Sequence, residues 1–117
     1  MQNLEQIRAA NALEPAKKLD RSAVNKLPAM ILSNGLLATA AFCDAEGGGD
    51  NRSGMKLALE VTAEHLVQRG LLARGKGTAR GIIEDLTTRD SIHLQRATSE
   101  SMAFIAYLKR FAPKKGN

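Results

Sequence analysis

Hydrophobic residues recur along most of the chain at the three- and four-residue spacing that is typical of an α-helix. The pattern predicts a first helix after Asn3, whose side chain can form a capping box with Gln6, and an end or kink of this helix at Pro15. A second helix is expected over residues 16–26, and another periodic stretch runs over residues 55–72. These elements already account for much of the chain without any strand.

The C-terminal third also follows a helical pattern, interrupted by residues that often cap helices. We expect a short helix over 82–87, another that Asp90 caps and that runs through Leu94, and a last one that begins at Thr98 or Ser99 and stops before Pro113. No strand, repeat or low-complexity tract stands out. The 117 residues therefore predict an all-α fold, a compact single-domain bundle of about five to six helices over 1–117.

One segment, from Leu27 to Cys43, is apolar on almost every side and has a proline in its first turn. Such a helix is usually buried, and this one is too short and too polar for a membrane span. Gly35 lies in its middle, where glycine costs about 1 kcal/mol relative to alanine. Either a neighbouring helix passes close to Gly35 or the helix breaks there, and we favour close packing. Cys43 is expected in the core.

Composition supports helices over strands, because aromatic residues make up 3% of the chain while hydrophobic residues make up 44%. The single cysteine excludes an internal disulfide. The first residues do not resemble a secretory signal peptide, so a cytoplasmic protein is expected.

The net charge of +5 is unevenly distributed. Acidic residues gather in a Gly-rich loop at 44–54, whereas a Gly-rich linker at 70–81 and a short tail at 113–117 are basic. Clustered basic residues on a small domain suggest a polyanionic partner, although an ordinary solvated surface is the alternative. The residues expected to contact nucleic-acid phosphates are Lys17, Lys18, Arg21, Arg74, Lys76, Arg80, Lys109 and Arg110. Lys17 and Arg21, four residues apart, are expected on one helix face.

Catalytic and cofactor motifs are incomplete. Residues 70–77 have the glycine and lysine spacing of a phosphate-binding loop, but Gly77 replaces the hydroxyl residue that would bind magnesium, and no strand precedes the loop. His65 and His93 are far apart in the sequence and have no ligand companions for zinc. Glu84 and Asp85 are interpreted as solvated surface carboxylates. We therefore predict no enzyme, cofactor, metal site or small-molecule substrate.

A family resemblance rests on the central segment Leu27-Pro28-Ala29-Met30-Ile31, on Asn34-Gly35-Leu36 and on Ala41-Phe42, together with Thr98-Ser99-Glu100 and the closing stretch 104–112. These residues resemble the small-subunit family of the type III-B (Cmr) CRISPR effector complex, which acts in antiviral defence. The resemblance implies a noncatalytic, all-helical subunit. It also implies that several copies stack as a minor filament, in contact with other Cmr subunits and with the guide RNA and target RNA backbones.

The charge pattern agrees with binding to an RNA backbone without base recognition, because the chain has many cations and few aromatic residues for stacking. An alternative is a protein-interaction scaffold module whose basic groups contact acidic faces of neighbouring subunits and never touch nucleic acid. A DNA-binding regulator would need a recognition helix with side chains for base edges, and none is evident. No membrane partner is expected.

Overall fold

The computed structural model describes residues 1–45 and 50–114, and every regular element among them is helical. Within these two ranges, six α-helices have eight or more residues, and they are joined by a single-turn helix and a 3₁₀ segment. The order is α1 (Leu4–Leu13), η1 (Pro15–Lys18), α2 (Arg21–Val24), α3 (Lys26–Asn34), α4 (Leu36–Asp44), α5 (Asp50–Gln68), α6 (Ala79–Leu86) and α7 (Ser91–Phe111). The predicted all-α, single-domain bundle is confirmed.

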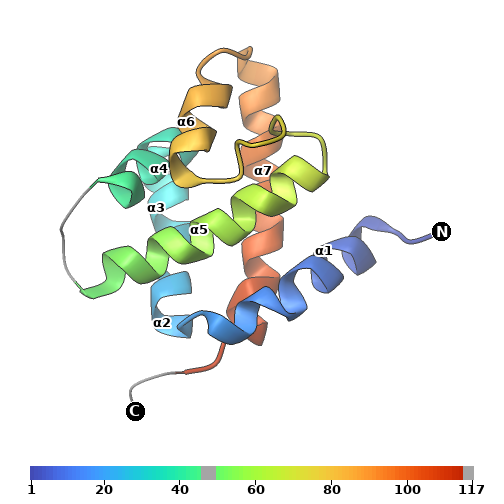
Figure 1. Cartoon of the computed structure of the whole chain (residues 1–117), viewed down its shortest axis with the longest axis vertical. Coiled ribbons are helices and arrows are strands. Elements are labelled where there is room, and N and C mark those ends of the chain that lie inside the picture. The colour runs from blue at the N-terminus through green and yellow to red at the C-terminus, as the bar shows by residue number, and fades with distance from the viewer. Residues whose placement is uncertain (46–49, 115–117) are drawn as a thin grey trace.

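The bundle is built around two long helices, α5 and α7, which cross each other (Figure 1). Helix α7 runs the length of the molecule and contacts α1, α2, α3 and α5. Its buried side chains Phe104, Ile105 and Leu108 meet a core that includes Leu59 and Leu66 of α5. Helices α4 and α6 pack against each other on the far side of α5 from α1.

The central apolar segment is not one helix, because it breaks at Gly35. Gly35 has φ +94° and ψ 161°, a backbone conformation that is essentially restricted to glycine. A Cβ atom at Gly35 would meet no atom within 4 Å, so the expected close packing of a neighbouring helix is wrong. The break is hydrogen-bonded on both sides: the Gly35 N–H donates to the Ile31 carbonyl, and the Gly35 carbonyl accepts from the Thr39 hydroxyl at 2.8 Å.

The two half-helices α3 and α4 are buried on one side only, so the expectation of burial all round is also wrong. Leu27, Ile31, Leu36 and Cys43 are in the core, which confirms the placement of the cysteine. Burial raises the pKa of the Cys43 thiol to about 11. On the outer side, Leu32 is 81% exposed, and no charged residue occurs between Leu27 and Cys43.

Two expected helix boundaries are corrected. The stretch 16–26 is not one helix, because Leu19 is extended and Asp20 starts α2 by accepting from the Ser22 N–H. At the other end, residues 91–111 form one helix rather than two. The Thr98 hydroxyl does not cap a new helix, because it donates back to the Leu94 carbonyl four residues earlier.

The loop bounds also differ from expectation. Residues 50–54 of the expected acidic loop are helical in α5, and Asp44 ends α4, whereas residues 46–49 lie outside the described residues. The basic linker is shorter than 70–81, because Thr78 caps α6 by accepting from the Gly81 N–H. A Cβ at Gly81 would come within 2.2 Å of the Lys76 carbonyl oxygen, so only glycine allows this close turn. Of the expected tail, residues 115–117 are not described.

Candidate nucleic-acid interface

The eight basic residues expected to contact phosphates do not form one surface. Those of the linker and α6 lie in the upper half of the molecule in Figure 1, whereas α2 and the last turn of α7 lie in the lower half. Three residues, Arg21, Lys109 and Arg110, come together at the lower end, although two separate parts of the sequence supply them. The structure therefore brings Arg21 together with Lys109 and Arg110, and separates the linker and α6 residues Arg74, Lys76 and Arg80 from them.

At this α2–α7 end, Arg21, Asn25, Ala106, Lys109 and Arg110 line a depression of about 400 Å³. Arg21 is half-buried and fixed, because its Nε donates to the Ala112 carbonyl at 2.9 Å. Lys109 and Arg110 are exposed in the last turn of α7, where cations interact favourably with the helix dipole. Neither has an ion-pair partner among the described residues. Their charges are therefore available to an anionic ligand.

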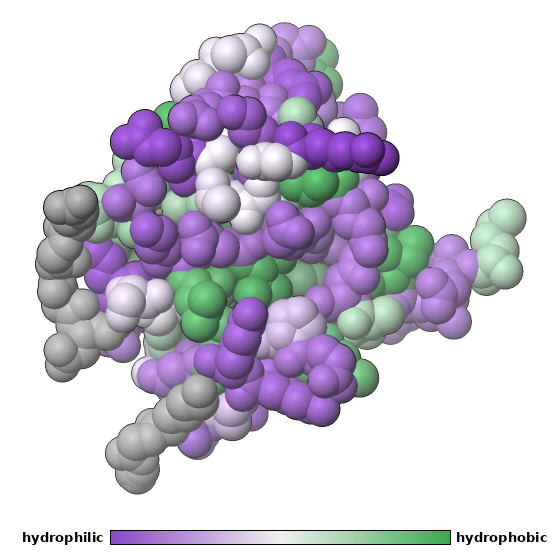
Figure 2. All heavy atoms as spheres, viewed as in Figure 1, coloured by the Kyte–Doolittle hydropathy of each residue, from purple (hydrophilic) through white to green (hydrophobic). Residues whose placement is uncertain are grey.

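Lys17 and Lys18 lie apart from that depression. Lys17 belongs to η1 and Arg21 to α2, so the expected shared helix face is wrong. Lys17 Nζ is 2.8 Å from Glu14 Oε2, and both side chains are well exposed. Lys18 lines a groove of about 440 Å³ that runs between α5 and the segment formed by α1 and η1. Hydrophobic atoms are visible between these segments in Figure 2.

The basic residues of the linker and of the start of α6 are largely neutralised by carboxylates. Lys76 Nζ is 2.9 Å from Glu84 Oε1, and Arg80 Nε is 3.3 Å from Asp44 Oδ2. The hydrogen bond from Lys76 lowers the pKa of the Glu84 carboxyl, which therefore stays charged. Arg74 is exposed and has no such partner among the described residues. Hydrophilic residues cover this part of the molecule in Figure 2, but their net charge is small.

Asp85 is not a solvated carboxylate, which corrects the interpretation of the Glu84 and Asp85 pair. It is 6% exposed, and it accepts hydrogen bonds from the Ala73 N–H at 2.6 Å and from Arg89 Nε at 2.7 Å. Burial disfavours its charged form, but these hydrogen bonds outweigh burial and hold the pKa of Asp85 below its usual value. Asp85 therefore fixes the linker to α6.

A buried polar cluster connects α1, α5 and α7. Arg8 of α1 donates to the Glu100 carboxylate of α7 from both Nε and Nη2, at 2.8 and 2.7 Å. Glu100 Oε2 also lies 2.8 Å from His65 Nε2, and the His65 ring stacks on Phe104 at 4.1 Å between ring centres. On its other side, His65 Nδ1 lies 2.9 Å from Asn11 Nδ2 of α1. The cluster attaches the N-terminal helix to the two central helices.

The hydrogen bonds of the cluster fix the tautomer of His65. The Asn11 amide group donates both to His65 and to Gln68 Oε1, so His65 Nδ1 acts as an acceptor and Nε2–H donates to Glu100. Burial lowers the pKa of His65 below 6.5, while the hydrogen bond to Glu100 acts in the opposite direction. His65 is therefore neutral in the folded protein at neutral pH.

Because His65 is buried and neutral in this cluster, we predict that the protein is less stable at mildly acidic pH than at neutral pH. The unfolded chain protonates His65 near pH 6.5, and the folded chain only at lower pH, so stability falls as the pH drops below about 6.5. Glu100, whose pKa is lowered from 4.5, adds a further loss below that value. We expect the free energy of unfolding to fall by about 1 kcal/mol between about pH 7 and about pH 5.5.

Urea denaturation at the two pH values measures this difference. The His65→Gln variant should lose most of the pH dependence, whatever its overall stability, and His93→Gln controls for the removal of a histidine. Equal pH dependence in His65→Gln and in the unmodified protein would contradict the assignment.

Sequence reasoning missed this cluster because its members are far apart along the chain. Arg8 and Glu100 are separated by 92 residues, and neither belongs to a charge cluster. The only signal was that Glu100 falls within a segment that carries the family resemblance. Among the described residues, no group of three or more His, Cys, Asp and Glu side chains could hold a metal ion. Nor does any described helix combine the length and hydrophobicity needed to cross a membrane.

The fold is thus a small, basic helical bundle with an uncompensated basic end. A comparison with protein-family models identifies the class as CRISPR-associated: the family described as CRISPR-associated protein (Cas_Cmr5) matches residues 2–114. Because the match covers nearly the whole chain, the protein belongs to the Cas_Cmr5 family, and the resemblance noted in the sequence is confirmed. Membership makes it a subunit of a Cmr complex. No curated protein and no solved structure matches the chain significantly.

Proposed function

We propose that the protein is a noncatalytic small subunit of a type III-B CRISPR ribonucleoprotein, which stacks with copies of itself as a minor filament and supports the guide–target RNA duplex. The α2–α7 end carries this proposal, because Arg21, Lys109 and Arg110 line one depression and the two terminal cations lack acidic partners among the described residues. Such an arrangement suits phosphate groups and provides no base recognition.

The backbone-binding proposal also agrees with the shortage of aromatic side chains. Among the described aromatic residues, Phe104 is buried and stacked on His65, and Tyr107 and Phe111 are half-buried and pack on each other. Arg52 covers the ring of Phe42 at 4.1 Å. These rings are engaged within the protein and offer little surface for stacking on unpaired bases.

A second candidate function, a protein-interaction scaffold, is favoured by the outer face of α3 and α4. Ala29 and Leu32 of α3 and Ala38 of α4 are exposed there, and no charged residue occurs between Leu27 and Cys43. An exposed apolar face on a complex subunit suits contact with another protein. The two functions are compatible, because the uncharged face and the basic α2–α7 end involve different helices.

Removal of the charges of Lys109 and Arg110, in the last turn of α7, should weaken RNA binding. The Lys109→Gln/Arg110→Gln variant should bind a short RNA duplex about tenfold more weakly at moderate salt, and the slope of log affinity against log salt should decrease by about one to two. Fluorescence anisotropy across a salt series measures both quantities, and circular dichroism checks the fold.

A charge-matched control is available in Lys76→Gln/Arg80→Gln, which also removes two cations. We expect a smaller loss of RNA affinity here, because Glu84 and Asp44 already neutralise these side chains. Equal losses in the two variants would mean that net charge matters and the α2–α7 end does not. Absence of RNA binding by the unmodified protein at low salt would favour the scaffold function.

A further inference from the structure

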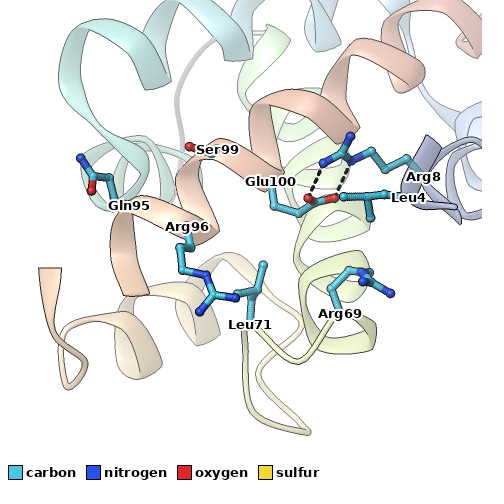
Figure 3. A pocket seen from close by; sticks show the side chains of 8 residues that line it. All are labelled: Leu4, Arg8, Arg69, Leu71, Gln95, Arg96, Ser99 and Glu100. Atoms are coloured by element: carbon cyan, nitrogen blue, oxygen red, sulfur yellow. Dashed lines mark hydrogen bonds and ion pairs between the residues drawn. The ribbon is translucent and has the colours of Figure 1, made fainter. Parts of the chain in front are cut away.

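A second cationic depression lies beside the Arg8–Glu100 pair. Three parts of the chain form it: α1, the segment that follows α5, and the first half of α7 (Figure 3). Its volume is about 500 Å³, and its lining residues are Leu4, Arg8, Arg69, Leu71, Gln95, Arg96, Ser99 and Glu100. None of these residues is among the eight that the sequence predicted as phosphate contacts.

The depression contains one guanidinium group that is held in place. The two hydrogen bonds to Glu100 fix the orientation of Arg8 (Figure 3). Glu100 is itself held by His65. A guanidinium has five N–H groups, so three N–H groups of Arg8 have no acceptor among the described residues. The side chain remains 23% exposed. Arg8 is therefore a preoriented donor at the wall of the depression.

Two further guanidinium groups are not neutralised. Figure 3 shows Arg69 and Arg96 on either side of Leu71, and neither has an ion-pair partner among the described residues. Glu100 is the only carboxylate in the lining, and Arg8 already balances its charge. The depression therefore has a net charge of about +2, since His65 behind it is neutral. Gln95 and Ser99 add uncharged hydrogen-bonding groups.

From this arrangement we infer that the depression formed by Arg8, Arg69 and Arg96 binds a phosphodiester group of an RNA strand. Guanidinium groups suit phosphate oxygens because their N–H groups match the geometry of two oxygens at once. The volume exceeds that of a single phosphate and leaves space for the attached ribose, which Leu4 and Leu71 can contact. The inference rests on the proposed function and adds a second contact site to it.

An RNA strand fits better than an acidic peptide because the depression shares a rigid helix with the α2–α7 end. Arg96 and Arg110 are both in α7 and fourteen residues apart, so they lie about 21 Å apart along the axis and about 40° apart around it. An RNA strand carries one phosphate on every nucleotide, so a short strand can reach both sites. Acidic side chains of a peptide need not have such a regular spacing.

The test compares two variants that each remove two cations without removing a side-chain hydrogen bond among the described residues. Arg69→Gln/Arg96→Gln should weaken binding of a short RNA duplex by about tenfold and lower the salt slope by about one to two. Lys109→Gln/Arg110→Gln acts as the comparison at the other end. In addition, the backbone amide signals of Leu71, Gln95 and Ser99 should shift in nuclear magnetic resonance spectra when RNA is added to the unmodified protein.

The possible results separate the two proposals. If Lys109→Gln/Arg110→Gln weakens RNA binding while Arg69→Gln/Arg96→Gln does not, the depression is not an RNA site and the proposed function stands. If the unmodified protein fails to bind RNA, both fail. If poly-glutamate displaces the RNA and shifts the same amide signals as strongly as a phosphate competitor, the depression takes acidic peptides and the inference is overturned.

Discussion

Replacement of Glu100 by glutamine should lower the free energy of unfolding by about 3 kcal/mol, because the change leaves Arg8 without its counter-charge in a largely buried position. Glutamine has nearly the same volume as glutamate, so the loss would come from electrostatics and hydrogen bonding and not from a cavity. Chemical denaturation followed by circular dichroism measures the change. Limited proteolysis should cut α1 faster in the variant, since Glu100 holds this helix through Arg8.

The matched control is Glu84→Gln, which breaks the ion pair between Glu84 and Lys76 on the surface. Exposed ion pairs contribute little to stability, so this variant should unfold close to the unmodified protein. The same small change in both variants would contradict a structural role for the Arg8–Glu100 pair. A loss of stability in Glu100→Gln without faster cleavage in α1 would mean that the cluster stabilises the core and does not hold α1.

Replacement of Gly35 by alanine should destabilise the fold by about 2 kcal/mol, because alanine is strained at φ +94° and ψ 161°. The sign of this change in stability distinguishes a helix that breaks at Gly35 from a continuous one. If residues 27–43 formed one continuous helix, alanine would instead stabilise the protein by about 1 kcal/mol through its better helix propensity. Thermal and urea denaturation distinguish the two signs.

Ser33→Ala is the control for this prediction, because Ser33 is exposed in α3 two residues before the break. Its stability should stay close to that of the unmodified protein. A Gly35→Ala variant more stable than the unmodified protein would show that the chain prefers the continuous helix.

Capping patterns in the sequence predicted where helices begin correctly when a single hydrogen-bonding motif determines the boundary. The capping box of Asn3 and Gln6 forms as expected, and so does the Asp90 cap. The patterns failed where two outcomes differ by little free energy. A threonine such as Thr98 can start a helix or donate back to the preceding turn, and only packing in α7 selects the second outcome. At Gly35, the sequence favoured close packing over a break, and the structure has the break.

The candidate site was harder to predict because charges depend on three-dimensional neighbours. Lys17, Lys76 and Arg80 looked available in the sequence, but Glu14, Glu84 and Asp44 neutralise them in the fold. Only Glu14 is near its partner in the sequence. Arg69 and Arg96, in contrast, lie in different parts of the chain and converge only when α1, α5 and α7 pack together.

The attachment of α1 has a consequence for the dynamics of the molecule. Ala12 is the only residue of α1 that is fully buried, and Leu4 and Leu13 are exposed, so polar contacts through Arg8 and Asn11 contribute much of what holds the helix. Detachment of α1 would expose little apolar surface, and such local opening depends only weakly on denaturant. Arg8 would leave with the helix. The equilibrium between attached and detached α1 would therefore set the fraction of molecules in which the depression beside Glu100 is complete.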